Sequence, residues 1–244
     1  MNGSFFSRKF SSVTVCFFLL MIFFVSCGLE TLYYLDYPEN GHDVSHSNAD
    51  RLLDYFRFRT ADSSNIDAGF DFQGTEIYYK IFNSESKIVD SIASINNVQT
   101  SSDISAAANM LINTKKYRPL ISDISTSTPI VKESRATVEI RLNSYLKDNP
   151  SGIKINDVIT CRPKRNISSG SKRFGFEFNK DDQNNPVPKE GDEDVEWSSS
   201  TTTDGEWYVD LWAFSAGKDT SFTWSYSKAI HLGSITIKES EYNK

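Results

Sequence analysis

Hydrophobic and polar residues alternate with a period of two over much of the chain from residue 51 onward. The clearest stretch is 135–142, in which Ala136, Val138, Ile140 and Leu142 form one apolar face and polar residues lie between them. This alternation is typical of strands with one buried face. Further strands are expected at 55–59, 70–73, 76–82, 158–161, 173–178, 207–214, 222–226 and 235–237. The pattern predicts a mainly β domain.

The period changes between residues 84 and 118, where apolar residues recur every three or four positions. Ile88, Ile92 and Ile95 follow this spacing in the first half, and Ala108 and Leu111 follow it in the second. Such spacing is that of amphipathic helices. We therefore expect a short two-helix insertion at about 84–118 that packs on the sheet.

The segment 207–237 combines a long aromatic strand, a turn with Gly217, and a strand that ends in apolar alternation at Ile235 and Ile237. This order resembles the final two strands of fibronectin type III and other immunoglobulin-like domains. The resemblance covers about thirty residues and implies an immunoglobulin-like β-sandwich. We expect this sandwich to span residues 51–240.

Tyr208, Trp212 and Phe214 share one face of the strand 207–214, and the opposite face is also apolar. If exposed, these three aromatic side chains are a candidate binding face for a protein or carbohydrate ligand. In the alternative, the strand is central and the predicted helices cover the aromatic face. We favour the alternative because the helices need an apolar surface to pack against.

An apolar run, Val13–Val25, follows the two positive charges of Arg8 and Lys9 near the N-terminus. A transmembrane helix needs about 20 apolar residues to cross ~30 Å of hydrocarbon, and this run is shorter. A charged start, a short apolar run and the small residue Ser26 are the three parts of a secretory signal. The sequence predicts a signal peptide over residues 1–26.

Phe24-Val25-Ser26-Cys27 resembles the lipobox of bacterial lipoproteins, in the relaxed form that spirochaetes accept, with Phe24 where Leu is usual. The resemblance implies cleavage between Ser26 and Cys27 and acylation of Cys27, which would be the membrane attachment. Residues 27–50 are then expected to form the lipidated N-terminus and a tether. Gly28, Leu29 and Glu30 lack the Asp that retains enteric lipoproteins at the inner membrane. We therefore expect the outer membrane, with periplasmic and surface exposure both open.

Charge and cysteine content narrow the class of protein further. The net charge of −6 becomes −8 when Arg8 and Lys9 leave with the signal, and no basic cluster is present. Nucleic-acid binding is therefore not expected. With Cys16 removed and Cys27 acylated, Cys161 has no partner for an intramolecular disulfide. Its alternation with Ile159 indicates a small inward-facing hydrophobe rather than a reactive thiol.

Two stretches carry residues that bind metals elsewhere. The segment 180–196 is rich in acids, but their order does not match an EF-hand loop, so we expect a solvated loop. His42 and His46 are four residues apart in a Gly- and Ser-containing stretch that disfavours a helix. No metal or cofactor is expected at either place.

The sequence contains no nucleophile elbow, phosphate-binding Gly-rich loop, HExxH motif or paired-Cys motif. We therefore expect a protein that is not an enzyme. The expected function is that of a lipid-anchored cell-envelope lipoprotein with a non-catalytic binding or adhesion domain. A structural or assembly component of the envelope is the alternative, and a lipid-anchored hydrolase is the outside case.

Overall fold

The computed structural model describes residues 35–42, 44–45, 50–65, 70–99, 103–144, 149–168, 172–200 and 205–239. All of these belong to one compact unit. The predicted signal peptide, Ser26 and Cys27 lie outside the described residues. None of the helices in the described ranges is both long and apolar enough to cross a membrane.

The described residues form strands and short helices. The strands are β1 (Glu39–His42), β2 (Phe56–Arg59), β3 (Asp71–Phe82), β4 (Arg118–Pro119), β5 (Ile121–Ser122), β6 (Thr137–Arg141), β7 (Gly152–Ile155), β8 (Val158–Cys161), β9 (Pro163–Lys164), β10 (Val195–Glu196), β11 (Glu206–Lys218), β12 (Trp224–Tyr226) and β13 (Ile230–Lys238). The helices are η1 (Arg51–Leu53), η2 (Ser63–Asn65), α2 (Glu85–Val98), α3 (Ala106–Asn109) and the π-helical turn η3 (Met110–Thr114).

Two sheets contain most of these strands. The outer sheet has the order β1-β2-β6-β7-β8 and is antiparallel throughout. The central sheet is built on the long antiparallel pair of β3 and β11, which runs from Asp71 opposite Lys218 to Phe82 opposite Tyr208. β10 and β4 pair with β3, and β12 and β13 pair with β11. β10 is parallel to β3.

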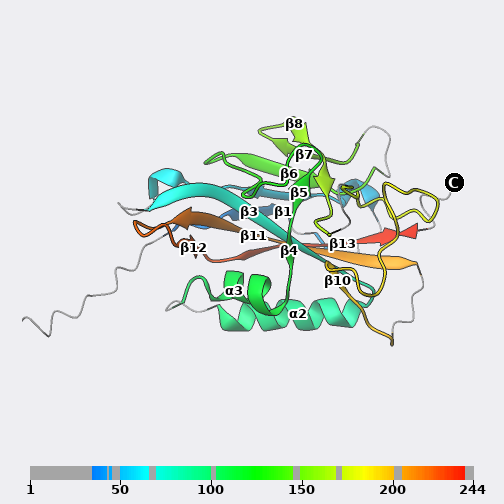
Figure 1. Ribbon diagram of the computed structural model, residues 1–244. Helices are drawn as coiled ribbons and strands as arrows, with labels where there is room; N and C mark the ends of the chain where they lie inside the picture. The colour runs from blue at the N-terminus through cyan, green and yellow to red at the C-terminus, as the bar shows by residue number, and fades with distance from the viewer. Residues whose placement is uncertain are drawn as a thin grey trace, which may run out of the picture. The chain divides into compact units, whose positions relative to one another are not determined.

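The central sheet lies between the outer sheet and the helices α2 and α3, so the domain has three layers (Figure 1). Alternating residues of β3 and β11 enter two separate cores. The inter-sheet core takes Ile77, Tyr79, Val209 and Leu211, together with side chains of the outer sheet. The helix-side core takes the opposite faces of the same strands and side chains of α2, α3 and η3. Both faces are therefore buried in β3 from Gly74 to Phe82 and in β11 from Trp207 to Gly217.

The structure confirms the mainly β fold and the inward faces predicted for several strands. Phe56 and Phe58 are buried in the inter-sheet core, as are Val138 and Ile140. The two packed sheets are consistent with a β-sandwich. The strand order does not establish an immunoglobulin-like topology.

Three strand predictions differ from the structure. The segments 70–73 and 76–82 form one strand, β3, which continues through Gly74. Gly74 has φ +136° and approaches the Val131 carbonyl so closely that a Cβ would lie 2.4 Å from its oxygen, so only glycine fits. The segment 173–178 is not a strand, although Phe176 and Phe178 are fully buried. β8 is an edge strand, and Ile159 is exposed rather than inward.

Candidate functional site

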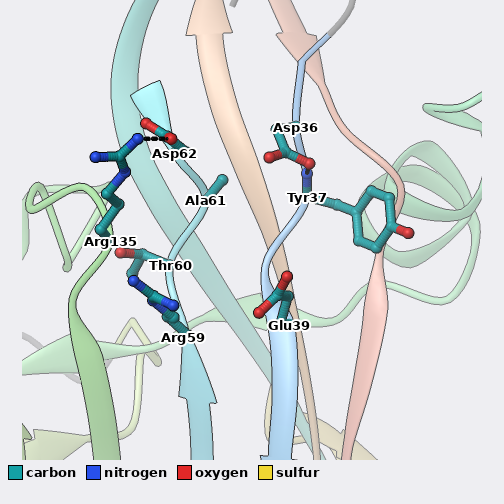
Figure 2. A pocket seen from close by; sticks show the side chains of 8 residues that line it. All are labelled: Asp36, Tyr37, Glu39, Arg59, Thr60, Ala61, Asp62 and Arg135. Carbon is teal, nitrogen blue, oxygen red and sulfur yellow. Dashed lines mark hydrogen bonds and ion pairs between the residues drawn. The ribbon is translucent and has the colours of Figure 1, made fainter. Parts of the chain in front are cut away.

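A polar pocket lies where the chain enters β1 and leaves β2. It has a volume of about 340 Å³, and Figure 2 shows its lining side chains. These are Asp36, Tyr37, Glu39, Arg59, Thr60, Ala61, Asp62 and Arg135. The register of the outer sheet explains the meeting of these segments, because Glu39 lies opposite Arg59 on β2 and Arg59 lies opposite Thr137 on β6.

One wall of the pocket is held together by an ion pair and hydrogen bonds. Arg135 forms an ion pair with Asp62, and the second oxygen of Asp62 accepts bonds from the Ser64 amide and hydroxyl at 2.9 Å and 2.7 Å. The Arg135 amide also donates to the Ala61 carbonyl at 3.1 Å. The hydrogen bond from Arg135 lowers the pKa of Asp62 to about 2. This carboxyl group therefore stays ionised through the physiological range.

Charges of both signs face the pocket. Arg59 and the paired Arg135 lie on one side, while the carboxylates of Asp36 and Glu39 lie on the other (Figure 2). The Tyr37 ring points away from the pocket in this view and lies 5.3 Å from the Lys228 ammonium. An arginine suits a carboxylate or phosphate, and carboxylates suit an ammonium group. The pocket therefore fits a small ligand that carries both charges.

A second polar cluster is buried in the helix-side core. Asp210 in the middle of β11 accepts hydrogen bonds from the Tyr117 hydroxyl at 2.7 Å and the Trp212 indole at 2.8 Å, both on Oδ2. Its Oδ1 lies 2.7 Å from Nε2 of His231 on β13. The Ser91 hydroxyl on α2 lies 3.2 Å from the Tyr117 hydroxyl. Burial raises the pKa of Tyr117 well above its ordinary value.

The Asp210–His231 pair resembles the acid–histidine half of a catalytic group only in its geometry. A catalytic histidine needs a nucleophile or substrate within hydrogen-bond reach of its second nitrogen. The only hydroxyl groups of this cluster, on Ser91 and Tyr117, lie on the Asp210 side of the pair. The cluster is therefore a buried carboxylate whose hydrogen-bonding capacity is satisfied. It connects β11 to β13 and to the helices.

The acidic segment 180–196 is held by the chain's own cations. Arg165, which is fully buried, bonds Asp194 through Nε and Nη2 at 2.9 Å and 2.8 Å and bonds Asp192 at 2.9 Å. Glu193 pairs with Arg118 and Glu196 pairs with Lys80. The expectation of a solvated loop is therefore wrong for its C-terminal part. Within the described ranges, no group of three or more metal-binding side chains is present.

The predicted aromatic face is not open to a ligand. Tyr208, Trp212 and Phe214 are buried in the helix-side core, with Trp212 only 1% exposed. Side chains of α2, α3 and η3 cover them, including Ile88, Ile95, Ala107, Ala108 and Leu111. The structure therefore contradicts a binding face at these three residues. It agrees with the favoured alternative, in which the helices cover them.

Of the remaining candidate residues, Cys161 and His42 lie in the part of the chain that the structure describes. Cys161 is half-buried, and burial raises the pKa of its thiol, which makes the reactive thiolate scarcer. His42 stacks on the Tyr55 ring at 4.2 Å, while His46 lies outside the described residues. Ser26 and Cys27, the predicted cleavage and lipidation residues, also lie outside them.

Sequence reasoning did not identify the pocket. Arg59 and Arg135 were visible only as members of polar strand faces, which are normally solvated. Pairing of β2 with both β1 and β6 brings them together, and no local motif encodes that pairing. Comparison with known proteins finds no family model, no curated protein and no solved structure that matches the chain.

Proposed function

We propose that this chain is a lipid-anchored lipoprotein of the bacterial outer membrane whose β domain binds a ligand without catalysing a reaction. The observation that carries the anchoring part is the apolar run Val13–Val25 followed directly by Ser26-Cys27. Two or more acyl chains on one cysteine hold a protein stably on a membrane, because each buried CH₂ contributes ~0.8 kcal/mol.

Cys27→Ser tests the anchor. The variant is expected to leave the detergent phase on phase separation, whereas the parent partitions into it. Cys161→Ser is the matched control, because it removes a cysteine from the folded domain and leaves the lipobox intact. Partition of Cys27→Ser like the parent would contradict the lipoprotein assignment. Sucrose-gradient separation of the two membranes of the parent cells tests the outer-membrane assignment.

The pocket with charges on both walls supports the binding part of the proposal. A short peptide or an amino acid offers a carboxylate for Arg59 and an ammonium group for Asp36 and Glu39. A neutral carbohydrate offers no charged group to either wall of the pocket. We therefore favour a ligand of peptide type over a sugar.

A thermal-shift screen with free amino acids and di- and tripeptides tests this ligand class. At least one member is expected to raise Tm, and Arg59→Gln is expected to abolish the shift. Arg57→Gln is the control, because Arg57 is exposed on the same strand but does not line the pocket. The absence of any shift across the screen would contradict the peptide-type site.

The alternative function is a structural or assembly component of the envelope. The exposed edge strand β8, with Val158 and Ile159 at its surface, is the feature that favours it, because such an edge can pair with another chain. Protease treatment of whole cells separates the two functions. Cleavage of the displayed domain supports binding or adhesion, and full protection supports assembly within the envelope.

A further inference from the structure

Two aromatic side chains are displayed at the tip of the hairpin between β11 and β12. Phe222 is 81% exposed and Trp224 is 41% exposed. Single exposed apolar residues are common on soluble proteins, so exposure alone assigns nothing. Two further observations support a role for this tip. These are its conformation and its position relative to the N-terminal segment from Tyr37 to Val44.

The tip is held in one shape. Asp219 Oδ1 accepts hydrogen bonds from the amides of Ser221 and Thr223, both at 2.8 Å. The Asp219 amide donates to the Thr223 carbonyl at 3.1 Å, and the Phe222 amide donates to the Asp219 carbonyl at 2.9 Å. The Lys218 ammonium lies 4.7 Å from the centre of the Trp224 ring. The aromatic pair is therefore presented by a fixed turn.

Phe222 itself adopts φ +61°, in the left-handed region. This conformation is uncommon for a bulky residue and costs of order 1–3 kcal/mol, so it persists only where the surroundings impose it. Here the surrounding hydrogen bonds direct an apolar ring into solvent. A strained backbone that displays a hydrophobic side chain is an arrangement expected of a contact surface.

The N-terminal segment runs towards this same tip. Val44 bridges to Gly233, the Asn40 side-chain Nδ2 donates to the His231 carbonyl, and the Tyr37 ring lies beside Lys228. Followed backwards from Val44 to Tyr37, the chain therefore runs along β13 in the direction of β12. Trp224 is four residues from Lys228, which is at most about 14 Å of chain.

The predicted anchor is close in sequence to this end of the domain. Cys27 precedes Leu35, the first described residue, by eight positions. Eight residues span at most about 29 Å even when fully extended. A lipid on Cys27 would hold the end of the domain that carries the hairpin tip close to the bilayer.

We propose that the β11–β12 tip, with Phe222 and Trp224, inserts into the headgroup region of the membrane to which the chain is anchored. This inference rests on the proposed lipidation of Cys27. Aromatic rings favour this interfacial region, because it accommodates an apolar body and a polar edge together. The ammonium groups of Lys218 and the exposed Lys228 lie on the same part of the domain and suit lipid phosphates.

The experiment uses the full-length lipoprotein, purified in detergent and reconstituted into phosphatidylethanolamine/phosphatidylglycerol vesicles with or without brominated acyl chains. Bromine quenches tryptophan fluorescence at short range. Quenching is expected in the parent and is expected to be lost in Trp224→Phe. Phe222→Asn is expected to weaken the quenching of Trp224. Asparagine is chosen for this variant because it tolerates the left-handed conformation.

Trp197→Phe is the matched control. Trp197 is 40% exposed, close to the value for Trp224, but it follows β10, which pairs with β3 at Phe82. Trp224 lies opposite Lys218, which pairs with the other end of β3 at Asp71. The two exposed tryptophans thus mark opposite ends of the central sheet. Trp197→Phe is expected to retain the quenching.

Mass spectrometry of the N-terminal peptide keeps the two proposals separate. Acylated protein that floats with the vesicles but shows no Trp224 quenching would overturn the inference and leave the lipid anchor intact. An N-terminal peptide without an acyl mass would overturn the anchor and this inference with it. Quenching lost equally in Trp197→Phe and Trp224→Phe would also contradict insertion of the tip.

Discussion

Oδ1 of Asp210 lies 2.7 Å from Nε2 of His231, and the Asp210 side chain has no exposed surface. The same carboxylate accepts the Tyr117 hydroxyl and the Trp212 indole on its other oxygen. One buried acid therefore connects the middle strand of the central sheet to an edge strand and to the helix layer. We expect this group to stabilise the domain through the partners it satisfies.

Asp210→Asn is expected to lower the free energy of unfolding by about 3 kcal/mol, because the amide cannot accept all three donors and leaves buried groups unpaired. His231→Gln is expected to cost less, since the His231 side chain is partly exposed and water can replace it. Urea unfolding monitored by circular dichroism measures both. An Asp210→Asn variant as stable as the parent would contradict a stabilising role.

Trp212→Ala is expected to cost roughly 3–5 kcal/mol, because it removes a fully buried indole from the helix-side core. Trp224→Ala is the control and is expected to cost under about 1 kcal/mol, since Trp224 is 41% exposed and lies outside both cores. Thermal and urea unfolding of both variants check the difference. Equal losses at the two positions would contradict the burial of Trp212 under the helices.

Arg165→Met is expected to cost about 3–5 kcal/mol, because it leaves the buried Asp194 without its cation. Arg118→Met removes the same type of cation from a partly exposed pair with Glu193 and is expected to cost under about 1 kcal/mol. Calcium added to the parent is expected to leave Tm unchanged. A calcium-dependent rise in Tm would show that the acidic segment binds the ion despite these pairs.

Glu76 gives the domain a pH-dependent contribution to stability. Burial raises the pKa of this carboxyl group, and its Oε2 has no hydrogen-bond partner. A raised pKa in the folded state means that the stabilising contribution is complete below the ordinary value of 4.5 and is lost as pH rises through the folded value. The parent should therefore lose stability more steeply than Glu76→Gln as pH rises above about 4.5.

Chemical denaturation at several pH values measures this slope, and Glu190→Gln is the control because Glu190 is exposed. The control is expected to follow the parent. Identical slopes for the parent and Glu76→Gln would contradict the raised pKa.

The period-two pattern was sufficient to predict the fold class and the inward faces of several strands. It succeeded at 135–142 because one face of β6 is buried and the other is partly solvated. The pattern was less informative for β11, because both of its faces are apolar. Burial on both sides was indicated only because the predicted helices need an apolar surface to pack against. It failed at 173–178, where Phe176 and Phe178 fill the core from a segment without strand pairing.

The sequence did not reveal the buried Arg165–Asp194 pair or the pocket, because both depend on contacts between residues far apart in the chain. Arg165 and Asp194 are 29 residues apart, and the pair forms only when the acidic segment folds back to lie beside β3. The pocket likewise depends on Arg135, which reaches Asp62 from 73 residues away. Charged residues on strand faces are ordinarily solvated, so their pairing cannot be read from local spacing.

The burial of β3 and β11 on both faces has a consequence for amide hydrogen exchange. Water reaches the buried parts of these strands, Gly74–Phe82 and Trp207–Gly217, only if the outer sheet or the helix layer separates from them, and each separation exposes a large apolar surface. Their amides should therefore exchange only through global unfolding, whereas the edge strand β8 should exchange through local opening. The slowest-exchanging amides would therefore lie on β3 and β11, the two strands that contribute side chains to both cores.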